Sequence, residues 1–167
     1  MIFVTVGSQK FQFNRLLKAV DDLLENGTID EEVFAQTGYS GYKPRYYQYK
    51  PFLDRDEFAD WESRADIVIT HGGTGAIIGA VKKRKKVIAV PRLAKYGEHV
   101  DDHQTQLIAE FKEQNLICGL DDCDQLADGV HYVKTHKFNS YVSNTNEIIN
   151  SIEQYITSLG EGESKND

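Results

Sequence analysis

Short apolar runs alternate along this chain with stretches in which apolar residues recur at helical spacing. The apolar runs, which we expect to be strands, span residues 2–6, 33–37, 46–49, 67–69, 87–90 and 116–118. The helical stretches span residues 13–24, 54–64, 102–114 and 148–159, and one more helix is expected between the strands at 67–69 and 87–90. Strands that alternate with helices predict an α/β fold, with a Rossmann-like parallel sheet and helices on both of its faces.

The strand expected at 67–69 leads into the glycine-rich turn His71–Gly75, and a helix is expected to start directly after it. Glycines let the backbone approach a ligand closely, and a helix start offers unpaired N–H groups and a partial positive charge. The turn is therefore typical of a site for a phosphate-bearing ligand. It lacks the ending of a P-loop and does not follow the first strand, as a dinucleotide fingerprint does. The structural alternative is a tight turn in which Thr74 caps the helix.

Two further turns follow strands of the same expected sheet. Gly7, Ser8 and Gln9 come after the first strand, and the polar loop 92–104 comes after the strand at 87–90. Loops after parallel strands open at one edge of a sheet, so we expect all three turns to face one crevice. The long loop is dense in side chains that suit the hydroxyl groups of a sugar: Glu98, His99, Asp101, Asp102, His103 and Gln104. A metal site is the alternative for this loop, but without HExxH or a cysteine set we expect no metal.

The composition narrows the classes of protein to consider. The 167 residues fit one domain, and the excess of 26 acidic over 19 basic residues, a net charge of −7, disfavours nucleic acid as a partner. Two cysteines, Cys118 and Cys123, indicate no disulfide framework and fit a reducing cytoplasm. The N-terminus is expected to be a strand and not a signal peptide, and no run approaches the roughly 20 apolar residues that span a bilayer. The basic run Lys82–Lys86 is typical of a solvated helix end, with anionic lipid headgroups as the alternative contact.

Three segments at the three turns resemble a known family. They are VTVGSQKFQFNRLL at 4–17, HGGTGAIIGA at 71–80 and PRLAKYGEHVDDHQTQLI at 91–108. In order and position they are similar to the C-terminal, nucleotide-sugar half of glycosyltransferase family 28, over roughly residues 1–160. The similarity is greatest to small stand-alone members, such as the catalytic subunit of the eukaryotic dolichol-linked UDP-N-acetylglucosamine transferase. The third segment looks most like bacterial members that act in capsule and exopolysaccharide synthesis.

This resemblance implies half of a GT-B architecture and a metal-independent, inverting transferase that uses a UDP-sugar and no cofactor. The donor-binding residues implied are Gly7, Ser8, Gln9, His71, Gly72, Gly73, Thr74, Gly75, Asp102, His103 and Gln104. The candidates for the catalytic base are Glu98, His99 and Asp101, with a base from a partner as the alternative. One position departs from the family. Relatives that build peptidoglycan hold the uridine ribose with a glutamate where this chain has Gly79, so ribose recognition is not implied there.

The length of the chain adds an expectation about partners. Residues 1–159 are expected to form one nucleotide-sugar-binding domain, followed by a disordered acidic tail at 160–167, which leaves no room for an acceptor domain. Small members of the family pair with a separate membrane-anchored subunit that binds the lipid-linked acceptor. The helix expected within 146–159 is the candidate docking segment, with packing on its own sheet as the alternative. The protein is then cytoplasmic and held at the inner face of the membrane through this partner.

The expected reaction transfers a hexose, from UDP-galactose or a similar UDP-hexose, or N-acetylglucosamine from its UDP derivative. The acceptor is a polyprenyl-diphosphate-linked sugar in exopolysaccharide or capsule synthesis. One alternative is a non-catalytic enhancer or scaffold subunit of a glycosyltransferase complex. A Rossmann-like dehydrogenase is disfavoured because residues 7–12 lack the GxGxxG pattern.

Overall fold

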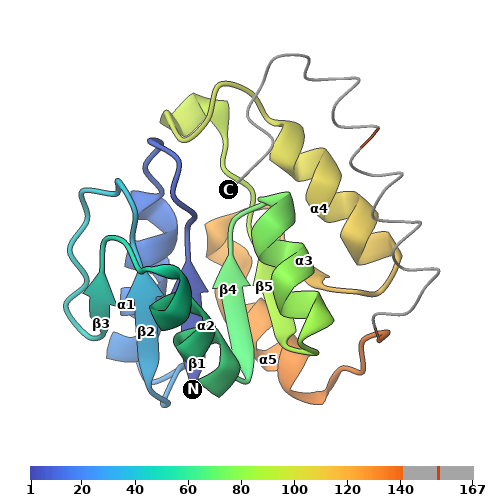
Figure 1. The fold of residues 1–167 in the computed structure, drawn as a ribbon, viewed down its shortest axis with the longest axis horizontal. Helices are drawn as coiled ribbons and strands as arrows, with labels where there is room; N and C mark the ends of the chain where they lie inside the picture. Colours follow the sequence, from blue (N-terminus) through green and yellow to red (C-terminus); the bar gives the residue numbers. More distant parts are fainter. Residues whose placement is uncertain (141–153, 155–167) are drawn as a thin grey trace.

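In the computed structural model, which describes residues 1–140 and residue 154, six parallel strands form one central sheet (Figure 1). Its strand order is β3-β2-β1-β4-β5-β6. The strands are β1 (Ile2–Thr5), β2 (Val33–Gln36), β3 (Gln48–Lys50), β4 (Ile67–Thr70), β5 (Lys86–Ala89) and β6 (Cys118–Gly119). The two central strands, β1 and β4, pair in register from Ile2 opposite Ile67 to Thr5 opposite Thr70.

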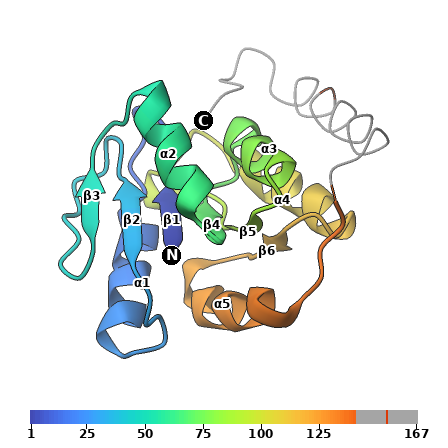
Figure 2. The ribbon, with the colours of Figure 1, turned by 60° about the horizontal axis from the view of Figure 1, so that its bottom comes forward.

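Helices cover both faces of the sheet (Figure 2). Helices α1 (Asn14–Glu25) and α5 (Leu126–Thr135) pack on one face, and α2 (Arg55–Arg64), α3 (Thr74–Lys82) and α4 (His103–Glu113) pack on the other. Single 3₁₀ turns, Ala94–Tyr96 and Cys123–Gln125, lie in the loops after β5 and β6. The expected α/β fold with a parallel, Rossmann-like sheet is therefore confirmed.

The central strands β1 and β4 are buried and largely apolar because both faces of the sheet are covered. In β1, Ile2 and Val4 belong to the core under α1 and α5, whereas Phe3 belongs to the core under α2, α3 and α4. All three side chains are fully buried. Burying a side chain of this size stabilises a fold by about 1.5–3 kcal/mol, so both layers hold the sheet firmly.

The central pair of strands is also the point at which the chain changes direction. From β1 the chain passes through α1 to β2 on one side, and from β4 it passes through α3 to β5 on the other side and on the opposite face. Ligands of open α/β sheets bind outside the carboxyl ends of the strands at such a switch point. The loops after β1, β4 and β5 all leave from that edge, at the top of Figure 1.

The elements differ from the sequence-based prediction at the sheet edges and at one helix. The strand predicted at 46–49 forms later, as β3, and that predicted at 116–118 forms as β6, because the exposed strand β3 and the two-residue strand β6 have weak apolar patterns. Helix α5 was not predicted, since Gly129 interrupts its short apolar stripe of Leu126, Val130 and Val133. The predicted helix within 146–159 and the tail 160–167 lie outside the described residues. Within the described part of the chain, no helix is long and apolar enough to span a membrane.

Candidate functional site

A pocket of about 380 Å³ opens at the switch point of the sheet. Its walls come from the ends of β1 and β2, from the start and inner face of α2, and from the first two turns of α3: Thr5, Gly7, Ser8, Gln36, Leu53, Asp54, Arg55, Phe58, Glu62, Gly75, Ala76 and Gly79. A volume of this size lies within the range of small-molecule sites. All three turns were expected to face one crevice. Residues of the first two turns line this pocket, whereas the loop 92–104 contributes no residue to its wall.

The wall formed by α3 offers a helix N-terminus without a cap. Gly73 is the N-cap residue, in extended conformation, and among the described residues no side-chain cap hydrogen bond is formed there. Thr74 is the first helical residue and not the cap that the structural alternative supposed. The backbone N–H groups and the positive end of the helix dipole are thus directed at the pocket, where an anion is stabilised.

The opposite wall begins at the turn after β1. Gly7 has a φ of 79°, a left-handed conformation that disfavours any residue with a Cβ. Its N–H donates to Thr5 Oγ1 over 3.4 Å, and a Cβ on Gly38 would lie 2.8 Å from its carbonyl oxygen. Ser8 follows as an exposed residue on the rim of the pocket. This turn is therefore closely constrained up to Gly7 and presents Ser8 to a ligand.

Beneath the two turns, Arg92 joins all three predicted ligand-binding segments. Its side chain is fully buried and donates to the carbonyl oxygens of Val6 (2.5 Å) and Phe11 (3.2 Å). Its other terminal nitrogen lies 3.2 Å from His71 Nδ1. The guanidinium group thereby links the loop after β5 to the turns after β1 and β4.

Gln104, from the first turn of α4, forms hydrogen bonds with the glycine turn and with the loop after β5. Its Oε1 accepts hydrogen bonds from the backbone N–H groups of Gly72 (3.1 Å) and Arg92 (3.0 Å). His71 and Gln104 are both buried and neither lines the switch-point pocket. Their positions indicate that His71 and Gln104 support the glycine turn. That they contact a sugar donor stays a prediction.

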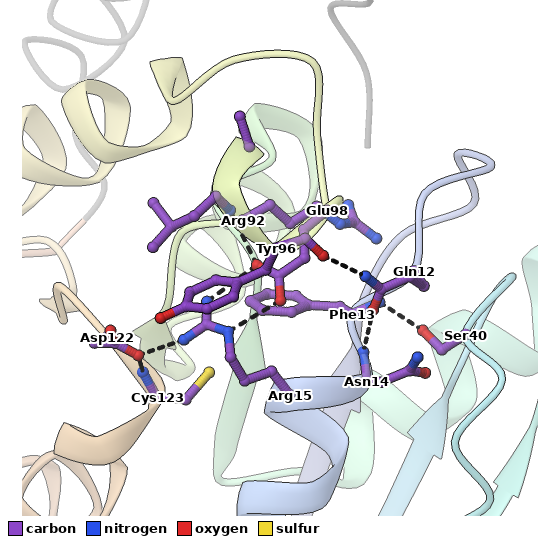
Figure 3. A network of polar contacts seen from close by, with 12 residues as sticks. Gln12, Phe13, Asn14, Arg15, Ser40, Arg92, Tyr96, Glu98, Asp122 and Cys123 are labelled. Carbon is purple, nitrogen blue, oxygen red and sulfur yellow. Dashed lines mark hydrogen bonds and ion pairs between the residues drawn. The ribbon is translucent and has the colours of Figure 1, made fainter.

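Glu98, one of the three candidates for the catalytic base, is held in an ion pair. It is 1% exposed, and Arg15 donates to both of its oxygens over 3.0 Å, while Leu93 N–H also donates to Oε1. Arg15 also pairs with Asp122 and lies over the ring of Tyr96 (Figure 3). Because both oxygens of this carboxylate are engaged by Arg15, the geometry favours a positioning role for Glu98.

His99, Asp101, Asp102 and His103 lie together in the loop before α4 and at the first residue of that helix. Asp101 Oδ1 lies 3.5 Å from His99 Nδ1 and 3.6 Å from His103 Nδ1, and it accepts from His103 N–H. The ring of His99 also packs on Phe11, with 5.1 Å between centroids. Asp102 accepts from Ala94 N–H and shapes the loop. Among the described residues, no group of histidine, cysteine and carboxylate side chains has the arrangement of a metal site.

Sequence reasoning missed the two side chains that most affect this region. Arg92 was treated as part of a polar loop, and Glu62 was not singled out within the helix predicted at 54–64, although it is 3% exposed and lines the pocket. A charged residue two positions after a buried apolar run was a signal for Arg92. For Glu62 the signal was weaker: one acidic residue among several on a helix of low apolar content.

The two cysteines lie outside the pocket and are expected to react slowly. Burial raises the pKa of Cys123 to about 12, and burial also raises the pKa of Cys118. At pH 8 both thiols stay protonated, and the thiolate is the reactive form. We expect iodoacetamide to label both cysteines at least about tenfold more slowly in the native chain than in urea, as measured by mass spectrometry. Equal rates in the two states would contradict the buried positions.

Comparisons with known proteins identify what the chain resembles. The family model described as the glycosyltransferase family 28 C-terminal domain matches residues 1–156. No curated protein matches the chain. A solved structure of a glycotransferase of kitacinnamycin is 13% identical, with a TM-score of 0.55 over 96% of this chain and 40% of that one. The calicheamicin glycosyltransferase CalG4 is 16% identical, with a TM-score of 0.57 over 95% of this chain and 39% of that one. The chain thus spans about two fifths of the length of these two structures, whose similarity supports the fold.

Proposed function

Because the chain belongs to the family of glycosyltransferase family 28 C-terminal domains, we propose that it binds a UDP-sugar in the switch-point pocket and takes part in sugar transfer. One observation carries the assignment: the uncapped N-terminus of α3 and the turn Gly7-Ser8 face each other across a pocket of about 380 Å³. The N–H groups of one wall suit a diphosphate, and the pocket between α2 and α3 suits a nucleoside.

The proposed reaction needs no metal and proceeds with inversion. An acceptor hydroxyl oxygen forms a bond to the anomeric carbon while the bond from that carbon to the UDP oxygen breaks. The N-terminus of α3 stabilises the negative charge that develops on the departing diphosphate. The proton of the acceptor passes to a base, for which His99 and Asp101 are better placed than Glu98, whose carboxylate is paired with Arg15.

The finer parts of the proposal rest on the resemblance of the sequence. The donor sugar is a hexose such as galactose, or N-acetylglucosamine, and the acceptor is a polyprenyl-diphosphate-linked sugar of exopolysaccharide or capsule synthesis. A membrane-anchored subunit binds this acceptor and holds the chain at the cytoplasmic side of the membrane, with residues 146–159 as the docking segment. Co-expression with such a subunit and a screen of UDP-sugars for lipid-linked product tests this part.

Replacing Ala76 with aspartate tests the donor site directly. Ala76 is the third residue of α3 and lines the pocket, so a carboxylate there repels a diphosphate. The same negative charge in the first turn stabilises a helix by about 0.3–1 kcal/mol, so folding is preserved. We expect the affinity for UDP, measured by isothermal titration calorimetry, to fall at least about tenfold, which corresponds to about 1.4 kcal/mol.

Ala109→Asp is the matched control, because it adds the same charge at an exposed position of α4 outside the pocket. UDP affinity is expected to be unchanged in this variant. Equal affinity in the Ala76→Asp variant and the native chain would place the diphosphate elsewhere. If the native chain shows no saturable binding of UDP or UDP-sugars, the alternative of a non-catalytic scaffold subunit is favoured.

A further inference from the structure

A buried acidic residue, Glu62, is part of the wall of the switch-point pocket. Glu62 lies on the face of α2 that is turned towards α3, and its side chain is 4% exposed. Its Oε1 accepts a hydrogen bond from Lys83 Nζ over 2.6 Å, and Lys83 itself is half exposed at the end of α3. The charge of Glu62 is thus balanced from the solvent side, while the carboxylate remains part of the pocket wall.

The carboxylate has hydrogen-bonding capacity beyond this ion pair. An ionised carboxylate accepts through two oxygens and about four lone-pair directions. Among the described residues, Lys83 is the one side chain that hydrogen-bonds to Glu62, and it does so through Oε1. A buried carboxylate with one such contact is stabilised by further donors, so the part of the pocket beside Glu62 favours a ligand that carries hydroxyl groups.

The other polar groups of the pocket are already engaged or lie at its rim. Gln36 donates to Thr5 Oγ1 and accepts from Leu53 N–H. Asp54 is exposed and accepts from Glu57 N–H as the N-cap of α2. Among the carboxylates that line the pocket, Glu62 is therefore the buried one that faces its interior.

Gly79 has no side chain that would fill the pocket between the N-terminus of α3 and Glu62. It lies four residues after Gly75 on α3, which is one helical turn or about 6 Å further from the phosphate-binding end. A Cβ at Gly79 would meet no atom within 4 Å, so packing does not require a glycine there, although glycine inside a helix is less favourable than alanine. The absence of a side chain keeps space beside α3 between the phosphate end and the carboxylate.

We propose that Glu62 is a specificity-determining residue that accepts hydrogen bonds from the ribose hydroxyls of the bound nucleoside diphosphate. The inference rests on the proposed function, because it takes the diphosphate to lie at the N-terminus of α3. With the phosphates at Gly75, the ribose attached to them extends along Gly79, and its 2′ and 3′ hydroxyls face the carboxylate. A vicinal diol is well matched to an acceptor with two oxygens, and acidic residues bind ribose hydroxyls in this way in other α/β folds.

The test compares the affinities of UDP and 2′-deoxy-UDP in the native chain and in two variants. We expect the native chain to prefer UDP by about tenfold, the value of a hydrogen bond to a charged group. In Glu62→Ala the affinities for the two nucleotides are expected to agree within about twofold, because the substitution weakens the binding of UDP and leaves that of 2′-deoxy-UDP nearly unchanged. Glu62→Gln keeps the size of the side chain and is expected to show an intermediate preference, which serves if the alanine variant folds poorly. Calorimetric titration measures the affinities, and thermal unfolding shows whether each variant is folded.

Asp60→Asn is the matched control, since it removes one carboxylate from the exposed face of the same helix. It is expected to keep the native preference for UDP. If Glu62→Gln or Glu62→Ala weakens both nucleotides by one factor and keeps the preference, Glu62 acts on the fold alone and the inference fails. If the native chain binds UDP and 2′-deoxy-UDP equally well, the inference about Glu62 fails, whereas the proposed donor site is still supported. If the native chain binds neither nucleotide, both fail.

Discussion

Replacing Arg92 with methionine is expected to lower the free energy of unfolding by about 3 kcal/mol and to remove measurable UDP binding. The guanidinium group is fully buried, and without it the carbonyl oxygens of Val6 and Phe11 lose its hydrogen bonds. Each buried acceptor left in this way costs about 1–3 kcal/mol. Binding is lost because the turn Gly7-Ser8 and the turn at His71 are no longer held against each other. Urea unfolding gives the stability, and calorimetric titration gives the affinity.

Arg45→Met is the control for this substitution, because Arg45 is an exposed arginine outside the pocket. A change of less than about 0.5 kcal/mol is expected there. Arg92→Lys keeps a positive charge but cannot span the same acceptors, so its stability is expected to fall between those of the native chain and the methionine variant. An Arg92→Met variant with native stability and native affinity would show that the three loops are held by other contacts.

Replacing Gly72 with alanine is expected to have the second-largest effect. The added Cβ would lie 2.6 Å from Gln104 Cβ and 3.1 Å from Gln104 carbonyl oxygen. Relief requires the start of α4 to move away from the glycine turn, which strains the hydrogen bond from Gly72 N–H to Gln104 Oε1. Such overpacking costs about 1–3 kcal/mol, so we expect about 2 kcal/mol of lost stability. UDP affinity is expected to fall more than about tenfold, because the N-terminus of α3 shifts with the turn.

Gly41→Ala provides the comparison, since a Cβ at this exposed position meets no atom within 4 Å. Its unfolding midpoint and UDP affinity are expected to stay native. The same two measurements therefore separate the effect of replacing any glycine by alanine from the effect of the steric overlap with Gln104 at Gly72. If Gly72→Ala has the same stability and UDP affinity as Gly41→Ala, then α4 moves to accommodate the added Cβ without disturbing the glycine turn.

The central part of the fold was predictable because each buried strand has a local signature. Residues 2–6, 33–37, 67–69 and 87–90 are apolar runs, and the structure has a strand within each or within a residue or so of its ends. The edge strands β3 and β6 were displaced because an exposed or two-residue strand makes little apolar contact. Helix α5 was missed since its three apolar contacts are separated by a glycine and by polar residues.

The candidate site was predictable only as far as its backbone. Glycine-rich turns after parallel strands point to one edge of a sheet, and Gly7, Ser8 and Gly75 do line one pocket there. What the side chains of the long loop do was beyond local reasoning. Glu98 is held by Arg15, which lies 83 residues earlier, and no short-range pattern indicates such a pair. Burial of Arg92 likewise depends on contacts with segments that are distant in the sequence.

The contacts around Arg92 also bear on the order in which the chain assembles. Arg92 and Val6 are 86 residues apart, Gln12 and Tyr96 are 84 apart, and Arg15 and Asp122 are 107 apart. Contacts this far apart in sequence close large loops, and they form after the short-range ones. A refolding chain that has formed only β1, α1 and β2 lacks the switch-point pocket, because one of its walls belongs to α3. Recovery of UDP binding is therefore a measure of completed assembly, whereas helix content and compaction return earlier.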